Sequence, residues 1–275
     1  MIEYNDILYF DTETTGLPPK GAQWDSDYES FPRICQLSWI YQGTENNYII
    51  HPDGWTIPEE ATAVHGITNE YAQEHGVALE LALSEFIKDC KDAKLVCGHN
   101  IYFDISIVKS EYMRRGVYND VIDAALFKGK RIDTMSPSMA FVDARFPNGR
   151  LKFPRLEELY ARCFPGESFP AHDAIEDVRA VVRCLPVLVR KGLIELAVKE
   201  YPEIQVDQAM TANVPENAKS LTRPAEKAEN CPTIASNVPD AQMPTEPEKT
   251  SHRSKSNEIT SKDDIIAKLM ADDNF

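Results

Sequence analysis

The sequence predicts an α/β fold in which a mixed sheet of five strands carries helices on both faces and a disordered tail follows. Three observations support this. Short apolar segments alternate with segments of helical periodicity over residues 1–200, which is typical of strands joined by helices. The first three strand-like segments follow one another without a helix pattern, so we expect an antiparallel meander. Beyond Tyr201 the composition changes sharply.

Each expected strand is a short run of apolar and β-branched residues. These strands span residues 7–11, 34–41, 48–51, 95–98 and 131–134. The expected helices repeat apolar residues about every three to four positions. They span residues 70–92 (starting late in that range), 105–115, 155–163, 174–190 and, as a short closing helix, 193–199. Pro186 should kink the 174–190 helix or end it early, because proline lacks an amide hydrogen and crowds the preceding turn.

The C-terminal part of the chain is expected to lie outside the folded domain. Residues 202–274 contain no aromatic residue and cannot bury enough apolar area to offset the entropy lost on folding. We therefore expect a domain at 1–200, a disordered linker at 201–260 and a short amphipathic helix at 261–275. That last segment begins with a capping-box pattern and is interpreted as a docking peptide for a protein partner. A frayed terminus is the alternative, since so short a helix is marginal alone.

Charge and composition argue against several classes of protein. A net charge of −15 disfavours a protein that coats nucleic acid by bulk attraction, although an enzyme with one local basic patch stays compatible with it. No apolar run approaches the length of a membrane span, and the N-terminus lacks the regions of a signal peptide. The six cysteines show no Cys-x-x-Cys spacing, so we expect reduced core thiols in a cytoplasmic protein.

The residues that point to chemistry fall in three stretches. Asp11 and Glu13 end the first expected strand, Asp104 stands alone, and His172 precedes Asp177 by five positions. Side chains two positions apart on a strand share one side, so the first two acids project together. Four carboxylates at one point repel one another unless cations neutralise them. Mg²⁺ prefers such oxygens and keeps several waters, which suits phosphate chemistry. The set predicts a nuclease.

A basic stretch lies between the second and third of these motifs. From residue 128 to 155 there are seven basic residues against two acids; the basic ones are Lys128, Lys130, Arg131, Arg145, Arg150, Lys152 and Arg155. A charge run is usually only a solvated face. Its place between two catalytic motifs favours a grip on the substrate backbone.

The same residues resemble those of a known family. The motifs are Asp11-Thr12-Glu13-Thr14-Thr15-Gly16-Leu17, Val64-His65-Gly66-Ile67-Thr68, His99-Asn100-Ile101-Tyr102-Phe103-Asp104 (continuing to Glu111) and Ala171-His172-Asp173-Ala174-Ile175-Glu176-Asp177. Over roughly residues 5–190 they resemble DEDDh 3'-5' exonucleases of the DnaQ-like group, whose nuclease subunits and domains proofread the products of DNA polymerases. The second motif is similar to a segment of DNA polymerase III epsilon-type members. The resemblance implies an RNase H-like fold.

The resemblance also implies roles for individual residues. Asp11, Glu13, Asp104 and Asp177 would hold two divalent ions, Mg²⁺ or Mn²⁺, that activate the attacking water and stabilise the leaving 3' oxygen. His172 would be the general base, because histidine ionises nearest to neutral pH. The expected substrate contacts are Thr12, Thr14, Leu17, His65, Asn100, Lys130, Arg150 and Lys152. His99 is expected to orient Asp104 or to contact phosphate.

Some of these residues have a purely structural alternative. Asp104 could cap the helix expected at 105–115, as Asp173 is expected to cap the last helix. His65 could be a turn histidine. Glu176 competes with Asp177 as a metal ligand, and we reject it because its spacing does not fit the motif.

We therefore expect a metal-dependent 3'-5' exonuclease that releases nucleoside monophosphates from single-stranded or frayed DNA 3' ends, in proofreading or repair. An unpaired end enters such a site most readily, since a paired end must first be unstacked and melted. One alternative is an exoribonuclease of the same fold that trims RNA 3' ends. Another is a polymerase-associated binding subunit that recruits its partner through the tail. The epsilon-like segment favours DNA.

Overall fold

The computed structural model describes residues 2–126 and 131–196. Within these ranges, five strands form one sheet in the order β3-β2-β1-β4-β5. β2 lies antiparallel between β1 and β3, whereas β1, β4 and β5 run parallel. The strands are β1 (Ile7–Thr14), β2 (Ile34–Tyr41), β3 (Thr44–Ile49), β4 (Leu95–Gly98) and β5 (Arg131–Asp133). The predicted mixed five-stranded sheet with an initial meander is confirmed.

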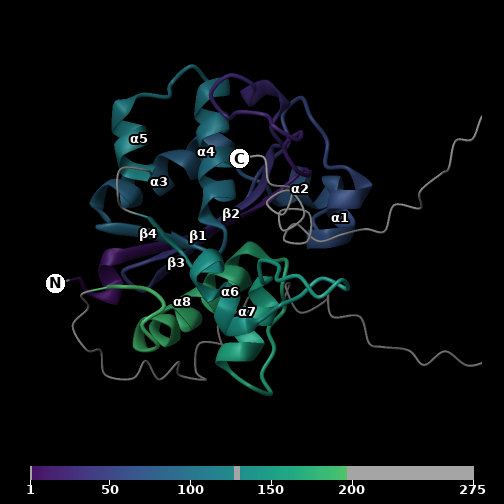
Figure 1. The fold of residues 1–275 in the computed structure, drawn as a ribbon. Helices are drawn as coiled ribbons and strands as arrows, with labels where there is room; N and C mark the ends of the chain where they lie inside the picture. The colour runs from purple at the N-terminus through teal and green to yellow at the C-terminus, as the bar shows by residue number, and fades with distance from the viewer. Residues whose placement is uncertain (1, 127–130, 197–275) are drawn as a thin grey trace, which may run out of the picture. The chain divides into compact units, whose positions relative to one another are not determined.

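Helices cover both faces of this sheet, with α3, α4 and α5 on one side and α6, α7 and α8 on the other (Figure 1). The described helices are α1 (Glu59–His65), α2 (Asn69–His75), α3 (Leu79–Asp92), α4 (Ile101–Arg114), α5 (Asp120–Leu126), α6 (Met135–Val142), α7 (Leu156–Cys163) and α8 (Ala174–Arg190). Two short 3-10 turns, η1 (Tyr4–Asp6) and η2 (Tyr28–Ser30), complete the set.

β1 divides the hydrophobic core in two. Successive side chains on a strand point to opposite faces, and β1 follows this rule. Leu8 and Phe10 belong to the core under α3 and α4, whereas Ile7 and Tyr9 belong to the core under α7 and α8. All eight residues of the strand are buried, so both faces of its carboxyl end are enclosed by protein.

Several predicted helix and strand boundaries were wrong. The helix expected to start late within 70–92 is confirmed as α3, which begins at Leu79. The separate helix α2 before it was not predicted; the chain leaves α2 at Gly76, and Val77 pairs with the segment after β3. A Cβ at Gly76 would lie 2.5 Å from the amide nitrogen of His51, so only glycine permits this close approach. The helix expected at 105–115 begins at Ile101, and the strand expected at 48–51 lies earlier, at β3. Helices α1, α5 and α6 were not predicted.

Pro186 does not end α8, which continues to Arg190. An interior proline costs about 3 kcal/mol, but Leu185 and Leu188 are fully buried, and each such side chain contributes about 1.5–3 kcal/mol. Packing against β1 therefore outweighs the lost hydrogen bond. The closing helix expected at 193–199 is absent from residues 193–196; its remainder, the linker and the 261–275 helix lie outside the described residues.

Two general expectations can be compared with the described chain. The five cysteines found there are free thiols, and four of them are buried. None of the described helices has the length and apolar character that a membrane span requires.

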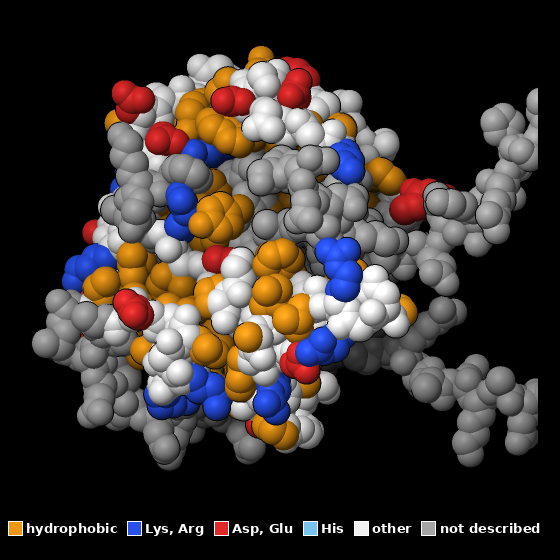
Figure 2. All heavy atoms as spheres, in the orientation of Figure 1, with side chains coloured by type: hydrophobic (Ala, Val, Ile, Leu, Met, Phe, Trp, Pro, Cys, Tyr) orange, Lys and Arg blue, Asp and Glu red, His pale blue; other side chains and the backbone are white. Residues whose placement is uncertain are grey.

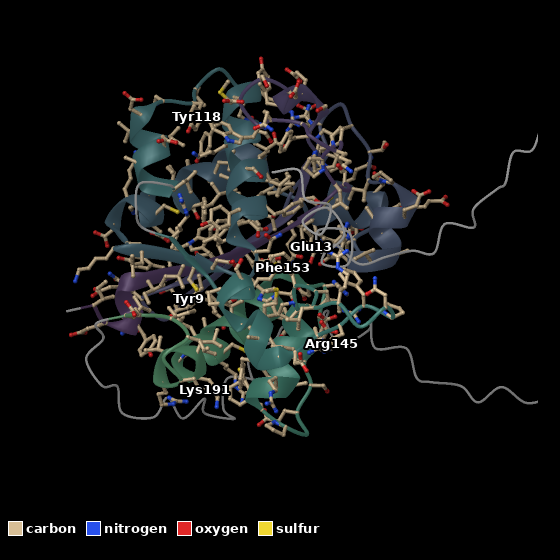
Figure 3. The ribbon with its side chains drawn as sticks, viewed as in Figure 1. Tyr9, Glu13, Tyr118, Arg145, Phe153 and Lys191 are labelled. Carbon is tan, nitrogen blue, oxygen red and sulfur yellow. The ribbon has the colours of Figure 1, made fainter. Side chains whose placement is uncertain are left out.

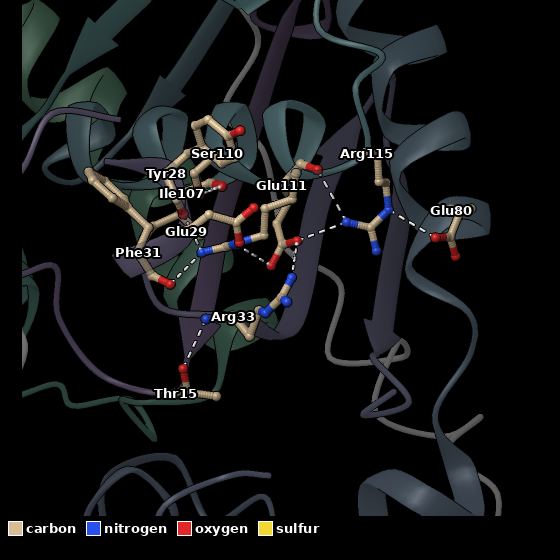
Figure 4. A network of polar contacts seen from close by, with 11 residues as sticks. Thr15, Tyr28, Glu29, Phe31, Arg33, Glu80, Ile107, Ser110, Glu111 and Arg115 are labelled. Carbon is tan, nitrogen blue, oxygen red and sulfur yellow. Dashed lines mark hydrogen bonds and ion pairs between the residues drawn. The ribbon is translucent and has the colours of Figure 1, made fainter. Parts of the chain in front are cut away.

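A buried glutamate on α4 holds the loop that follows β1 (Figure 4). The Glu111 side chain is fully buried and lies 3.2 Å from Arg33, 3.0 Å from Arg114 and 2.8 Å from Arg115. Arg114 also donates to the carbonyl oxygens of Tyr28 and Phe31. The cluster thereby attaches the segment around η2 to α4.

Arg33 links this cluster to the end of β1. Its amide nitrogen donates to the Thr15 hydroxyl at 2.9 Å, and its carbonyl oxygen accepts from the Thr15 amide at 2.9 Å. The loop from Thr15 to Arg33, which contains Leu17, is therefore closed by a pair of hydrogen bonds and anchored by Glu111.

Replacing Glu111 with glutamine should destabilise the fold strongly. The change removes the negative charge that faces three arginines, and leaving buried charge unpaired costs about 3 kcal/mol or more. We expect the Glu111→Gln free energy of unfolding, measured by urea denaturation, to fall by about that amount.

The matched control is Glu80→Gln, which removes an exposed partner of Arg115. Its effect should stay below about 1 kcal/mol, as for surface ion pairs in general. Equal stability of the two variants would contradict a structural role for the Glu111 cluster.

Candidate active site

Three carboxylates meet at the carboxyl end of β1. One oxygen from each of Asp11, Glu13 and Asp177 lies within 4.8 Å of the other two. The odd-numbered positions of β1 face α8, as Ile7 and Tyr9 do, so both strand acids point toward the first turn of that helix. Asp177 lies in this first turn, where the amide groups of a helix N-terminus favour negative charge. Figure 3 shows Glu13 near the middle of the view.

Asp104 approaches β1 from the opposite face. It lies in the first turn of α4 and is fully buried. Its Oδ1 accepts hydrogen bonds from the Thr12 amide at 3.1 Å and from the Thr12 hydroxyl at 2.7 Å. Thr12 stands between the two strand acids, so Asp104 fixes the backbone that positions them. It does not belong to the group of three, nor does it cap α4, whose cap position is Asn100.

The start of α8 is held by a glutamine that the sequence analysis did not single out. Gln36 pairs with Glu13 across β1 and β2. Its Nε2 donates to Asp173 at 2.8 Å, and its Oε1 accepts from the Ala174 amide at 3.3 Å. Asp173 is the cap residue of α8, as expected, although its side chain bonds to Gln36 and not to the helix. The signal available in the sequence was a polar glutamine within the apolar run that forms this strand.

His172 precedes α8 in a left-handed conformation, with φ of 68°. Its Nε2 lies 3.6 Å from a carboxylate oxygen of Glu157, which stands in the first turn of α7. The His172 side chain is 28% exposed, so solvent can reach the imidazole. Glu157 is a second residue that the sequence analysis missed, because α7 is distant in sequence from the motif.

His65 is a neutral imidazole near both Thr14 and His172. Burial lowers its pKa to about 4; the Thr14 backbone opposes this shift and His172 adds to it. Nδ1 accepts a hydrogen bond from the Ile67 amide at 3.1 Å. A neutral ring that accepts at Nδ1 carries its proton on Nε2, so His65 presents a buried N–H donor. The residue ends α1, immediately before Gly66 in the left-handed region.

The remaining predicted contacts differ in their surroundings. The hydroxyl of Thr14 donates to the carbonyl oxygen of Gly16 at 2.7 Å, within the turn that leads to Leu17, and Leu17 is half-buried against the core. Asn100 is buried in a left-handed conformation, and its Nδ2 has no hydrogen-bond partner in the structure. His99 binds Thr134 and the Pro154 carbonyl through its two ring nitrogens, so both nitrogens are committed to the fold and not to Asp104 or phosphate.

Only some of the basic residues predicted to contact the substrate backbone are exposed in the described structure. Lys152 is mostly buried and paired with Glu158 at 3.0 Å, whereas Arg150 is exposed on the turn between Arg145 and Leu151. Arg145 pairs with Asp143 and lies below Glu13 in the view of Figure 3. Lys128 and Lys130 lie outside the described residues.

The group of three carboxylates suits a hard divalent cation. All of its donors are oxygen, and Asp11 and Glu13 are only 7% and 5% exposed. Gathering buried carboxylates is costly unless positive charge is present. Asp11, Glu13 and Asp177 could therefore hold an ion such as Mg²⁺ or Mn²⁺. Glu176 bonds instead to Arg179, which agrees with its rejection as a ligand.

Comparison with solved structures identifies the fold. One match is a structure of exonuclease I, at 22% identity and a TM-score of 0.54, covering 68% of this chain and 42% of that one. Exonuclease I from Methylocaldum szegediense matches at 20% identity and a TM-score of 0.52, covering 67% of this chain and 40% of that one. E. coli exonuclease I in complex with a dT13 oligonucleotide matches at 20% identity and a TM-score of 0.53, covering 66% and 40%. The chain spans about two fifths of the length of these enzymes.

Sequence comparison gives the family. No curated protein matches the chain. A family model described as Exonuclease (RNase_T) matches residues 8–185, which include all the motifs and all of the sheet except Ile7. Because this match covers more than half of the sequence, the chain belongs to the RNase T family of exonucleases, with the RNase H-like fold.

Proposed function

We propose that this protein is a metal-dependent 3'-5' exonuclease that releases nucleoside monophosphates from single-stranded or frayed DNA 3' ends. The observation that carries the proposal is the meeting of Asp11, Glu13 and Asp177 at the end of β1. Family membership supports hydrolysis of nucleic acid. The oligonucleotides named with E. coli exonuclease I, dT13 and dA16, favour single-stranded DNA as the substrate. A preference for unpaired ends would suit proofreading or repair.

The four acids have two different roles in this proposal: three bind the cations, and Asp104 positions the backbone of β1. Asp11, Glu13 and Asp177 would hold the divalent cations. When bound, such ions supply positive charge that lowers the pKa of the attacking water and offsets charge on the departing 3' oxygen. Asp104 keeps Thr12 in place from the other face of β1, so Asp11 and Glu13 keep their spacing as substrate enters.

His172 acts as the general base. It takes a proton from the water as the water's oxygen bonds to phosphorus and the bond from phosphorus to the 3' oxygen breaks. Glu157, 3.6 Å from Nε2, faces the imidazolium that this transfer creates.

The terminal nucleotide meets donors and an apolar side chain around the end of β1. Leu17 follows Gly16, whose φ of 147° gives the chain a conformation that favours glycine, and the pair places the leucine beside the strand end. His65 offers Nε2–H and Asn100 offers Nδ2, both uncharged donors suited to sugar or phosphate oxygens. Arg150 remains exposed for the backbone of the strand.

The proposal is tested by a time course on 5'-labelled single-stranded DNA with Mg²⁺ or Mn²⁺. We expect stepwise shortening from the 3' end, faster from a mismatched than from a matched duplex end. Asp177→Asn should reduce the rate about a thousandfold or more, because it removes a cation ligand. Glu176→Gln changes the neighbouring half-buried acid, which pairs with Arg179, and should retain activity.

Three outcomes would contradict the proposal. Equal rates for Asp177→Asn and Glu176→Gln would rule out the assigned ligand group. Activity that persists in EDTA would rule out the metal. Faster trimming of a matched RNA strand would move the assignment to an exoribonuclease.

The pairing of His172 with Glu157 is tested by a double-mutant cycle. His172→Ala should lower kcat by about 10²- to 10⁴-fold, the usual contribution of a general base. Glu157→Gln should lower kcat about fivefold without raising KM, since a half-exposed ion pair contributes about 1 kcal/mol. The double variant should lose no more than His172→Ala alone; losses that multiply would show that Glu157 acts independently of His172.

The lowered pKa of His65 predicts a pH-dependent stability. The folded state resists protonation down to a pKa of about 4, whereas an unfolded histidine titrates near 6.5. Between these values the unfolded state binds more protons, so His65 makes the fold less stable as the pH falls. His65→Gln should remove a loss on the order of 2 kcal/mol between pH 7 and pH 5, measured by urea denaturation. The exposed His75→Gln is the control, and identical pH slopes in both variants would refute the prediction.

A further inference from the structure

Tyr102 and Arg131 form an exposed aromatic and cationic pair at the N-terminal end of α4. Tyr102 is the second residue of α4 and is 49% exposed. The guanidinium carbon of Arg131 lies 4.9 Å from the centre of its ring, within the range of a cation–π contact. Arg131 begins β5, the last strand in the sheet order. The pair therefore lies at the edge of the sheet.

Tyr102 points away from the acids but shares a helix end with one of them. Residues two positions apart on an α-helix are separated by about 200° around its axis. Asp104 faces β1 through its bonds to Thr12, so Tyr102 faces the other way, toward Arg131. The tyrosine does not reach the phosphodiester that the proposed function places at the acids, but it lies within one helical turn of Asp104, which positions Thr12 between them.

Core packing does not account for this tyrosine. Its neighbours Ile101 and Phe103 are 0% and 8% exposed, so they fix α4 against the sheet. A ring left half in water gains little from burial. Arg131 covers the ring from one side, and the 49% exposure of Tyr102 leaves room for a further planar group to contact the ring.

We infer that Tyr102 stacks on a base of the single strand, upstream of the nucleotide that is cleaved, with Arg131 supporting the ring and facing the strand's phosphates. The inference rests on the proposed function, because it places the 3' end at the acids. Every base offers a flat π face, so aromatic stacking grips a strand without regard to sequence. An arginine adds both cation–π support and attraction for phosphate.

The surface around the pair fits such a strand. Figure 2 shows hydrophobic side chains across the middle of the face that carries the lower end of α4, with Lys and Arg side chains at the lower edge over α7 and α8. Apolar side chains can contact the bases of a single strand while neighbouring basic side chains contact its phosphates. The overall electrostatic field of a chain with a net charge of −15 does not attract nucleic acid. Local apolar and basic contacts of this kind would bind the strand instead.

The test measures binding of fluorescent dT oligonucleotides of increasing length by anisotropy, in EDTA so that no strand is cut. Tyr102→Ala should weaken binding of the longer oligonucleotides about tenfold, since base stacking contributes ~1–3 kcal/mol. Binding of a dinucleotide, which cannot reach beyond the terminal site, should be unchanged. Tyr102→Phe should bind as the wild type does, because it keeps the ring.

The matched control is Tyr71→Ala, which removes another exposed tyrosine, on α2; it should leave binding unaltered. Tyr102→Ala binding long strands like the wild type, or losing dinucleotide affinity equally, would overturn the inference. In hydrolysis of long strands, Tyr102→Ala should raise KM and leave kcat intact. A wild-type protein that shows length-dependent binding through Tyr102 but cuts no 3' end would refute the proposed function and not the stacking platform.

Discussion

The alternation of side chains along β1 is the constraint on which the site depends. One strand presents Ile7, Tyr9, Asp11 and Glu13 to α8 and presents Leu8, Phe10 and Thr12 to the other face. A shift of one residue in register would turn the acids away from Asp177 and expose half of each core. The same pattern that packs the domain therefore also sets the spacing of the carboxylates, and neither can vary independently of the other.

Burying carboxylates has an unfavourable free energy, and in the described structure groups on both faces of β1 offset part of it. The first turn of α8 brings Asp177 to a helix end whose amides favour negative charge, and Gln36 ties that end to β2. On the opposite face, Oδ1 of Asp104 accepts two hydrogen bonds from Thr12. Under the proposed function, bound cations would offset the repulsion among the remaining three carboxylates, and metal binding would then stabilise the end of β1.

The sequence predicted the sheet better than it predicted the helices. The acids could be found because they end apolar runs and recur at motif spacing, and the family resemblance is confirmed by the match over residues 8–185. Helices α1, α5 and α6 have seven or eight residues, too few for a clear periodicity, and tertiary packing holds them. Gln36 and Glu157 were missed because their roles come from contacts between segments distant in sequence. The prediction at Pro186 was wrong because the burial of apolar side chains on α8 outweighs the low helix propensity of proline.

A single helix brings the separate parts of the proposed mechanism together. α4 carries Tyr102 on one side and Asp104 on the other side of its first turn, and Glu111 two turns later. Glu111 anchors the loop that holds Leu17, and Asp104 anchors the middle of β1. Any tilt of α4 would therefore move the terminal-nucleotide loop, the strand acids and the stacking platform in concert. A rigid α4 keeps the distance from Tyr102 to the acids constant. Under the proposed function, a strand stacked on Tyr102 would therefore deliver its 3' end to the same point after each cleavage.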